Sequence, residues 1–157
     1  MSLVISHWSF VIGHGSFVQT EDGVGTKGFV NLEVYRLAED LANSVWKIVG
    51  RWNGLARDTV GKQMVRAADS VGANIAEGVG RGSYQDNRRF VRMARGSLNE
   101  ARHWLRCAYK RKLLSEQEVS MLKPLLDELA PRLNAYLRSI GPVVAKEAAE
   151  GQVSNDK

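Results

Sequence analysis

The chain has 157 residues, of which 44% are hydrophobic and 25% charged, and its formal net charge is +5. No apolar run approaches the roughly 18 residues that a membrane-spanning helix needs, so we expect a single cytoplasmic globular domain. The only cysteine, Cys107, excludes an intramolecular disulfide and a multi-cysteine metal site, and its place beside an apolar face predicts a buried thiol. The three histidines show no ligand spacing with one another or with Cys107. We therefore expect no metal and no cofactor.

Residues 1–30 are predicted to form a disordered, low-complexity tail. Two near-identical segments, residues 5–11 and 12–18, are followed by a glycine-rich stretch without periodicity. The segments lack the basic start of a signal peptide, and two copies are too few for a solenoid. Translated repetitive DNA upstream of the real start is one explanation of the repeat. An adhesive or metal-binding pair of strands is the weaker alternative.

Apolar residues at steps of three and four predict four helices, so we expect an all-α, antiparallel up-down four-helix bundle over residues 31–141. Ser83 is the expected N-cap of the third helix. Ser115 and Glu118 form a capping box at the start of the fourth helix. The predicted helices cover about residues 32–51, 58–79, 84–112 and 116–140.

The fourth predicted helix contains two prolines, Pro124 and Pro131, each of which removes a backbone donor. We expect one bent helix rather than two, because the apolar residues keep their helical phase across both prolines. Gly141 and Pro142 end this helix. Residues 142–157 are predicted to be a second disordered tail.

The second predicted helix carries a polar stripe beside its apolar one. Short Ser and Asn side chains favour a polar seam packed against the third helix, since a solvated face has no need for such moderate helix formers. We expect Arg66 and Glu100 to link the two helices, and Gly96 and Ser97 to let them approach closely. The seam residues are Gln63, Arg66, Ser70, Asn74, Glu77, Ser97 and Glu100.

Positive charge is concentrated in the middle of the chain. Residues 57–112 hold thirteen Lys and Arg against five Asp and Glu, although the whole chain is only +5. Six cations of the third predicted helix fall within a wedge of about 80° that is expected to point away from the core. This cationic stripe consists of Arg88, Arg92, Arg95, Arg102, Arg106 and Lys110.

A row of cations is self-repulsive unless anions offset it. Phosphate is the favoured partner because the planar fork of arginine binds two oxygens at once, so the stripe is predicted to bind RNA or DNA. A subunit interface rich in acids and a plain solvated surface stay open as alternatives. Acid–base catalysis by Glu77, Glu100 and His103 is weaker, because nothing gathers these groups around a cleft. We therefore expect no catalytic residue and no enzyme.

Two ordered motifs carry a family resemblance. They comprise Arg66-Ala67-Ala68, Ser70-Val71, Asn74-Ile75-Ala76-Glu77-Gly78 and Arg81, then Phe90-Val91, Met93-Ala94 and Gly96-Ser97-Leu98-Asn99-Glu100. Both resemble the signatures of the bacterial four-helix-bundle proteins encoded by intervening sequences of 23S rRNA genes. The resemblance covers about residues 32–140. It departs near residues 52–59, where the family tends to carry a proline and an aromatic-glycine pair. The resemblance therefore does not imply the geometry of the first interhelical loop.

The resemblance implies a four-helix bundle that oligomerises. It extends to the accessory variability determinant of diversity-generating retroelements, a basic pentamer that binds nucleic acid beside a reverse transcriptase. It thus implies a homopentameric adaptor whose partners are RNA or DNA and a reverse transcriptase. The alternative is a self-assembling module that binds no nucleic acid. Large aromatic residues that a slim bundle cannot hide also favour a closed oligomer: Tyr35, Trp46, Trp52, Trp104, Tyr109 and Tyr136.

Overall fold

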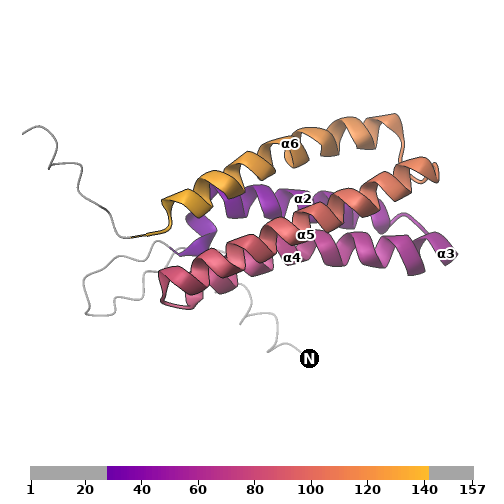
Figure 1. Cartoon of the computed structure of the whole chain (residues 1–157). Helices are drawn as coiled ribbons and strands as arrows, with labels where there is room; N and C mark the ends of the chain where they lie inside the picture. The colour runs from indigo at the N-terminus through magenta and orange to yellow at the C-terminus, as the bar shows by residue number, and fades with distance from the viewer. Residues whose placement is uncertain (1–27, 142–157) are drawn as a thin grey trace, which may run out of the picture.

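The computed structural model describes residues 28–141, and every regular element in this range is helical. The predicted tails, 1–30 and 142–157, lie outside the described residues except for residues 28–30. Figure 1 shows four long helices lying lengthwise beside one another, with connections that alternate between the two ends. The prediction of an all-α four-helix bundle is confirmed. The long helices are α2 (Glu33–Val49), α4 (Lys62–Gly80), α5 (Tyr84–Lys110) and α6 (Glu116–Ser139).

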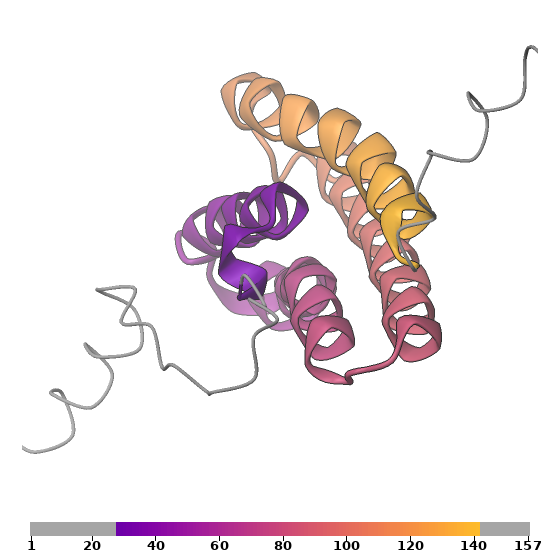
Figure 2. The ribbon, with the colours of Figure 1, turned by 90° about the vertical axis from the view of Figure 1, so that its left-hand side faces the viewer.

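The helices follow the order α2, α4, α5, α6 around the bundle, so that each packs against two neighbours (Figure 2). All four contribute to the core through large apolar side chains, such as Leu41, Ile75, Leu98 and Leu133, that are at most 2% exposed. No polar or charged residue in the described range is fully buried. Removal of apolar surface from water is therefore the main stabilising contribution. None of the described helices is both long and apolar enough to cross a membrane.

The described part of the chain begins with a 3-10 turn, η1 (Phe29–Asn31), which packs on α2 and α4. The ring of Phe29 meets the ring of Tyr35 edge-on, with centroids 4.8 Å apart. Phe29, which the sequence assigned to the tail, thus packs against the bundle.

The connection between α2 and α4 differs from the prediction, because helical structure resumes before residue 58. α3 (Gly54–Ala56) comes first, and a π-helical turn, η2 (Arg57–Gly61), leads into α4. A Cβ atom added at Gly61 would lie only 2.7 Å from Cγ1 of Val49, so this glycine lets the wide turn pack on the end of α2. A π-turn shifts the helical phase locally, which a regular 3.6-residue pattern cannot predict.

The predicted starts of α5 and α6 are confirmed. Oγ of Ser83 accepts a hydrogen bond from the backbone N–H of Asp86 at 3.1 Å. The capping box of α6 is complete: the backbone N–H of Glu118 donates to Oγ of Ser115 at 3.2 Å, and the backbone N–H of Ser115 donates to Oε2 of Glu118 at 2.8 Å. α6 then continues through both of its prolines as one helix, along a gently bowed path (Figure 1).

Glu118 also connects α6 to the end of α2. A guanidinium nitrogen of Arg51 donates to its Oε1 at 2.5 Å. The hydrogen bond from the Ser115 backbone lowers the pKa of Glu118 below its ordinary value of 4.5, and Arg51 adds to this shift while burial opposes it. A carboxyl group with a lowered pKa stabilises the fold when it is ionised. This contribution is complete above the ordinary value and is lost as the pH falls through the folded-state pKa.

We predict that Glu118→Gln lowers the free energy of unfolding at pH 7 by about 1 kcal/mol, because the amide can still accept the cap bond but loses the negative charge that strengthens it and that pairs with Arg51. The deficit should shrink as the pH is lowered below about 4, because the wild-type carboxyl then becomes protonated as well. Urea unfolding across this pH range measures both effects. Glu116→Gln is the control, since Glu116 is exposed in the same first turn and makes no cap bond. Equal, pH-independent losses in the two variants would contradict the prediction.

A glycine lets α4 and α5 come close together. A Cβ atom added at Gly78 would lie 2.7 Å from Oδ1 of Asn87 and 3.0 Å from Cβ of Phe90. The sequence predicted this role for Gly96 together with Ser97, and the prediction is wrong for Gly96: this glycine is exposed, and a Cβ atom there would meet open space.

We therefore predict opposite effects of the same substitution at the two glycines. Gly78→Ala should destabilise the protein by about 1–3 kcal/mol, because Asn87 and Phe90 must move apart from the new methyl group. Gly96→Ala should stabilise it by about 0.5–1 kcal/mol, because alanine loses less backbone entropy in a helix. Urea unfolding of both variants tests this. A destabilised Gly96→Ala, or an unaffected Gly78→Ala, would show that the helices meet elsewhere.

Candidate nucleic-acid interface

The cations of α5 have no carboxylate partners in the described chain. α5 carries seven Lys and Arg but only two acids, Asp86 and Glu100. Every ion pair between described residues uses a cation from another element. The pair of Arg132 with Glu33, at 2.8 Å, is one example on the α2–α6 side. α5 thus presents a surface whose positive charge the described residues do not neutralise.

Four members of the cationic stripe lie where the sequence predicted. Arg92, Arg95, Arg106 and Lys110 are exposed. Their spacing of three, four and eleven residues keeps them on one side of α5. These side chains are free to meet a ligand in solution.

Arg88 has a different position, at the C-terminal end of α6. Its Nη1 donates to the carbonyl oxygens of Leu137 and Ile140, at 3.1 and 3.0 Å. The last carbonyls of a helix have no donor within the helix and carry the negative end of its dipole. Arg88 therefore acts as a side-chain cap for α6.

Arg102 also crosses to α6. Its Nη2 donates to the carbonyl oxygen of Leu126 at 2.7 Å, and the residue is half-buried. The expectation that the whole stripe points away from the bundle is therefore wrong for Arg88 and Arg102. The reason is that α6 covers one edge of the stripe.

Two exposed tyrosines accompany the stripe on α5. Tyr84, four residues before Arg88, is 59% exposed, and Tyr109, three residues after Arg106, is 51% exposed. Residues three or four apart lie on the same side of a helix, so each tyrosine shares a side of α5 with one arginine of the stripe. From the sequence, Tyr84 was not predicted to belong to the site, and Tyr109 was predicted only as an aromatic residue that an oligomer interface would bury.

A groove of about 270 Å³ lies between α5 and α6, next to the stripe. Its lining contains three cations and no acid. The groove could not be predicted from the sequence, because it forms only where α5 and α6 pack together. The lining residues are Arg102, Leu105, Arg106, Tyr109, Leu114, Val119, Leu122, Lys123 and Leu126.

The polar seam between α4 and α5 is shorter than predicted. Its interhelical hydrogen bond joins Nδ2 of Asn74 to Oγ of Ser97 at 3.4 Å. Ser70 instead donates to the Arg66 carbonyl of its own helix at 2.7 Å. The uncharged members of the seam are all half-buried: Gln63, Ser70, Asn74 and Ser97. The seam therefore lies at the edge of the helix contact rather than inside it.

The predicted link between Arg66 and Glu100 is wrong. Both residues are exposed, and no ion pair joins them. Glu77 pairs with Arg81 of the following turn at 2.6 Å rather than with a residue of α5. Charged side chains of this contact stay in water because their desolvation would cost more than one ion pair returns.

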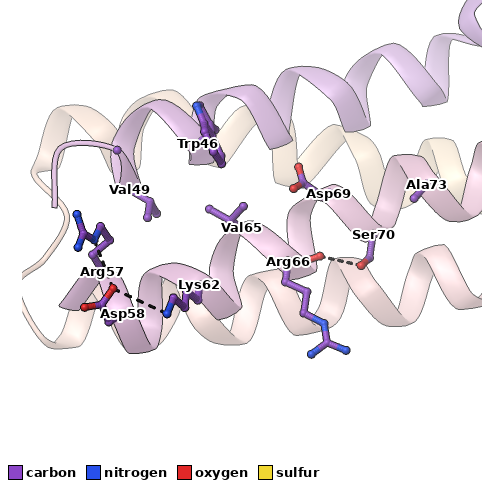
Figure 3. A pocket seen from close by; sticks show the side chains of 11 residues that line it. Trp46, Val49, Arg57, Asp58, Lys62, Val65, Arg66, Asp69, Ser70 and Ala73 are labelled. Carbon is purple, nitrogen blue, oxygen red and sulfur yellow. Dashed lines mark hydrogen bonds and ion pairs between the residues drawn. The ribbon is translucent and has the colours of Figure 1, made fainter. Parts of the chain in front are cut away.

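A larger groove, of about 600 Å³, lies between α2 and α4 (Figure 3). Trp46 forms one wall and is 66% exposed, and Val65 and Asp69 lie across from it. Burial raises the pKa of Asp69 above its ordinary value. Figure 3 shows Arg66 pointing away from Trp46, toward the far side of α4. Six aromatic residues were predicted to be too large for a slim bundle to bury. Two of them, Trp46 and Tyr109, are exposed. The other four pack against the core: Tyr35, Trp52, Trp104 and Tyr136.

His103 and Cys107 form a contact that the sequence analysis missed. Sγ of Cys107 lies 3.7 Å from Nε2 of His103, because an i, i+4 spacing places both on one face of α5. Cys107 is half-buried, not buried as predicted. Within residues 28–141 no three His, Cys, Asp or Glu side chains gather as metal ligands.

Comparison with known proteins identifies one matching family, described as 23S rRNA-intervening sequence protein, whose sequence model matches residues 30–135. No curated protein matches the chain. One similar solved structure is that of a protein of unknown function from the S23 ribosomal protein family of Bacteroides thetaiotaomicron VPI-5482. The TM-score is 0.60 at 19% sequence identity, and the match covers 68% of this chain and 99% of that chain. At this identity the likeness shows the fold alone.

The two kinds of position in the stripe predict different effects on stability. Arg88→Ala leaves the carbonyls of Leu137 and Ile140 without their donor, so it should lower the free energy of unfolding by about 1.5–3 kcal/mol. Arg92→Ala removes an exposed side chain and should change it by less than about 0.5 kcal/mol. Thermal and urea unfolding of both variants measure the difference. Similar stabilities would mean that Arg88 does not cap α6.

Proposed function

Since the chain belongs to the 23S rRNA-intervening sequence protein family, we propose that it is a non-enzymatic adaptor that binds nucleic acid through the outward surface of α5. One observation carries this proposal: none of the seven cations of α5 forms an ion pair in the described structure. Phosphates would supply the missing negative charge. Guanidinium groups suit them because each can bind two phosphate oxygens.

The geometry of the exposed stripe matches a phosphate backbone rather than a base edge. Arg92 and Lys110 are separated by about 27 Å along the helix, at 1.5 Å per residue. The stripe is convex and is made of long cationic side chains. Phosphate contacts fix the position of a protein on its ligand without reading sequence, so binding should depend weakly on sequence and strongly on salt.

The salt dependence gives the first measurement. Each neutralised phosphate releases condensed counter-ions. With about four contacts, affinity for a duplex should therefore fall roughly a hundred-fold between 50 and 200 mM salt. Fluorescence anisotropy with a labelled duplex measures this fall. The double variant Arg92→Glu/Arg95→Glu should abolish binding and keep the helical content, because both side chains are exposed.

A matched control distinguishes binding at a specific site from a general effect of net charge. Lys47→Glu/Arg138→Glu makes the same change in net charge at exposed positions on α2 and α6, and it should keep most of the affinity. Retention of nucleic acid at low salt by Arg92→Glu/Arg95→Glu would contradict the proposal, as would equal losses in both double variants. Light scattering on each variant reports its mass. Dissociation of the α5 variant into smaller species would favour a subunit interface at the stripe.

Self-assembly is the second candidate, and the groove between α2 and α4 favours it. A wall formed by Trp46, which is 66% exposed, is the kind of aromatic surface that interfaces bury. We propose a closed homo-oligomer, a pentamer by family resemblance, with a reverse transcriptase as a further partner. A protein that forms multimers but binds no nucleic acid at low salt would favour a self-assembling module instead.

A further inference from the structure

The groove between α5 and α6 is continuous with the cationic stripe, because Arg102 and Arg106 belong to both. Lys123, the third cation of its lining, pairs with Asp127 at 2.5 Å, so the two arginines supply the charge that is not neutralised. The rest of the lining is aliphatic except for Tyr109. Its ligand should therefore combine negative charge with an apolar, flat group.

We propose that this groove holds an unstacked base of a single-stranded nucleic acid, so that single strands are preferred to duplexes. This inference rests on the proposed nucleic-acid binding and names the class of ligand for the same surface. A duplex keeps its bases stacked inside and offers only phosphates to a helix surface. A single strand can turn a base outward onto an aromatic side chain while its backbone follows the cations.

Tyr109 provides the platform for this base. It is 51% exposed, although it stands among apolar side chains such as Leu105 and Leu122. Every base has a flat π-face, so stacking on this ring would not depend on sequence. Tyr109 thus combines an apolar setting with an accessible ring.

Arg102 is held in place for the neighbouring phosphate. Its hydrogen bond to the Leu126 carbonyl, at 2.7 Å, uses one of the five N–H donors of the guanidinium. The other donors stay available, and a side chain that is already ordered loses little further entropy on binding. The groove therefore combines an ordered cation and an exposed aromatic ring within two turns of α5.

The size of the groove favours a base over an amphipathic helix or a second copy of the chain. At about 270 Å³ it is less than half the volume of the groove beside Trp46, which is the better candidate for protein contacts. Its continuity with the exposed stripe also gives the ligand a charged path on one side, as a polynucleotide requires.

Three fluorescent DNA probes test the proposal by anisotropy at low salt: a 15-nucleotide single strand, its duplex, and an abasic strand of the same length and charge. The single strand should bind about 5- to 150-fold more tightly than the abasic strand, the range expected for one stacked base. Tyr109→Ala should remove this advantage and leave duplex affinity unchanged. Tyr84→Ala is the control, because Tyr84 is an exposed tyrosine of α5 outside the groove.

The outcomes separate this inference from the function on which it rests. Equal affinity for the single and abasic strands, or a Tyr109→Ala variant that keeps the single-strand advantage, overturns the base site and leaves phosphate binding intact. Absence of binding to all three probes overturns the nucleic-acid function itself. A lower mass of Tyr109→Ala by light scattering would show that the groove is a contact between copies, which also overturns the inference.

Discussion

The close contact between α4 and α5 at Gly78 is the constraint on which the rest of the bundle depends. The absence of a side chain there brings the backbone of α4 against Asn87 and Phe90. Asn87 also donates through Nδ2 to the hydroxyl of Tyr136 at 3.2 Å, so one residue joins three helices. Its buried Oδ1 has no hydrogen-bond partner in the described structure, and such an atom costs about 1–3 kcal/mol. The packing around Gly78 has to exceed that cost.

Features that depend on local chemistry could be predicted from the sequence, and features that depend on helix rotation could not. The caps at Ser83 and Ser115 act within one helical turn, and so their residues alone indicate them. Gly78 and Gly96 both stand in motif segments, yet only the side of the helix that meets a neighbour decides which glycine matters. Arg102 was predicted to point away from the bundle for the same reason: the rotation of α5 relative to α6 is not encoded in local spacing. A helix that packs against two neighbours, as α5 does, buries its apolar face and partly buries the polar residues at the borders of that face as well.

Two ion pairs join residues that are distant in the sequence, both on the α2–α6 side of the bundle. Arg132 of α6 pairs with Glu33 of α2, and Arg51, which follows α2, pairs with Glu118 of α6. Partners separated by 67 and 99 residues cannot be paired from sequence spacing. The sequence predicted a charged link between α4 and α5 instead, where the helices meet too closely to hold ionised groups without desolvation. Every ion pair between described residues thus uses a cation outside α5, and the described acids do not neutralise the charge of α5.

The uncompensated charge of α5 has to be tolerated by the rest of the fold. Neighbouring like charges on a helix cost a few tenths of a kcal/mol per pair. The structure reduces this repulsion by moving Arg88 and Arg102 toward carbonyl oxygens of α6, where partial negative charge offsets them. It leaves Arg92, Arg95, Arg106 and Lys110 exposed. Departures from local consistency of this kind are expected at functional sites. The proposed phosphate contacts would offset the repulsion that remains among these four cations.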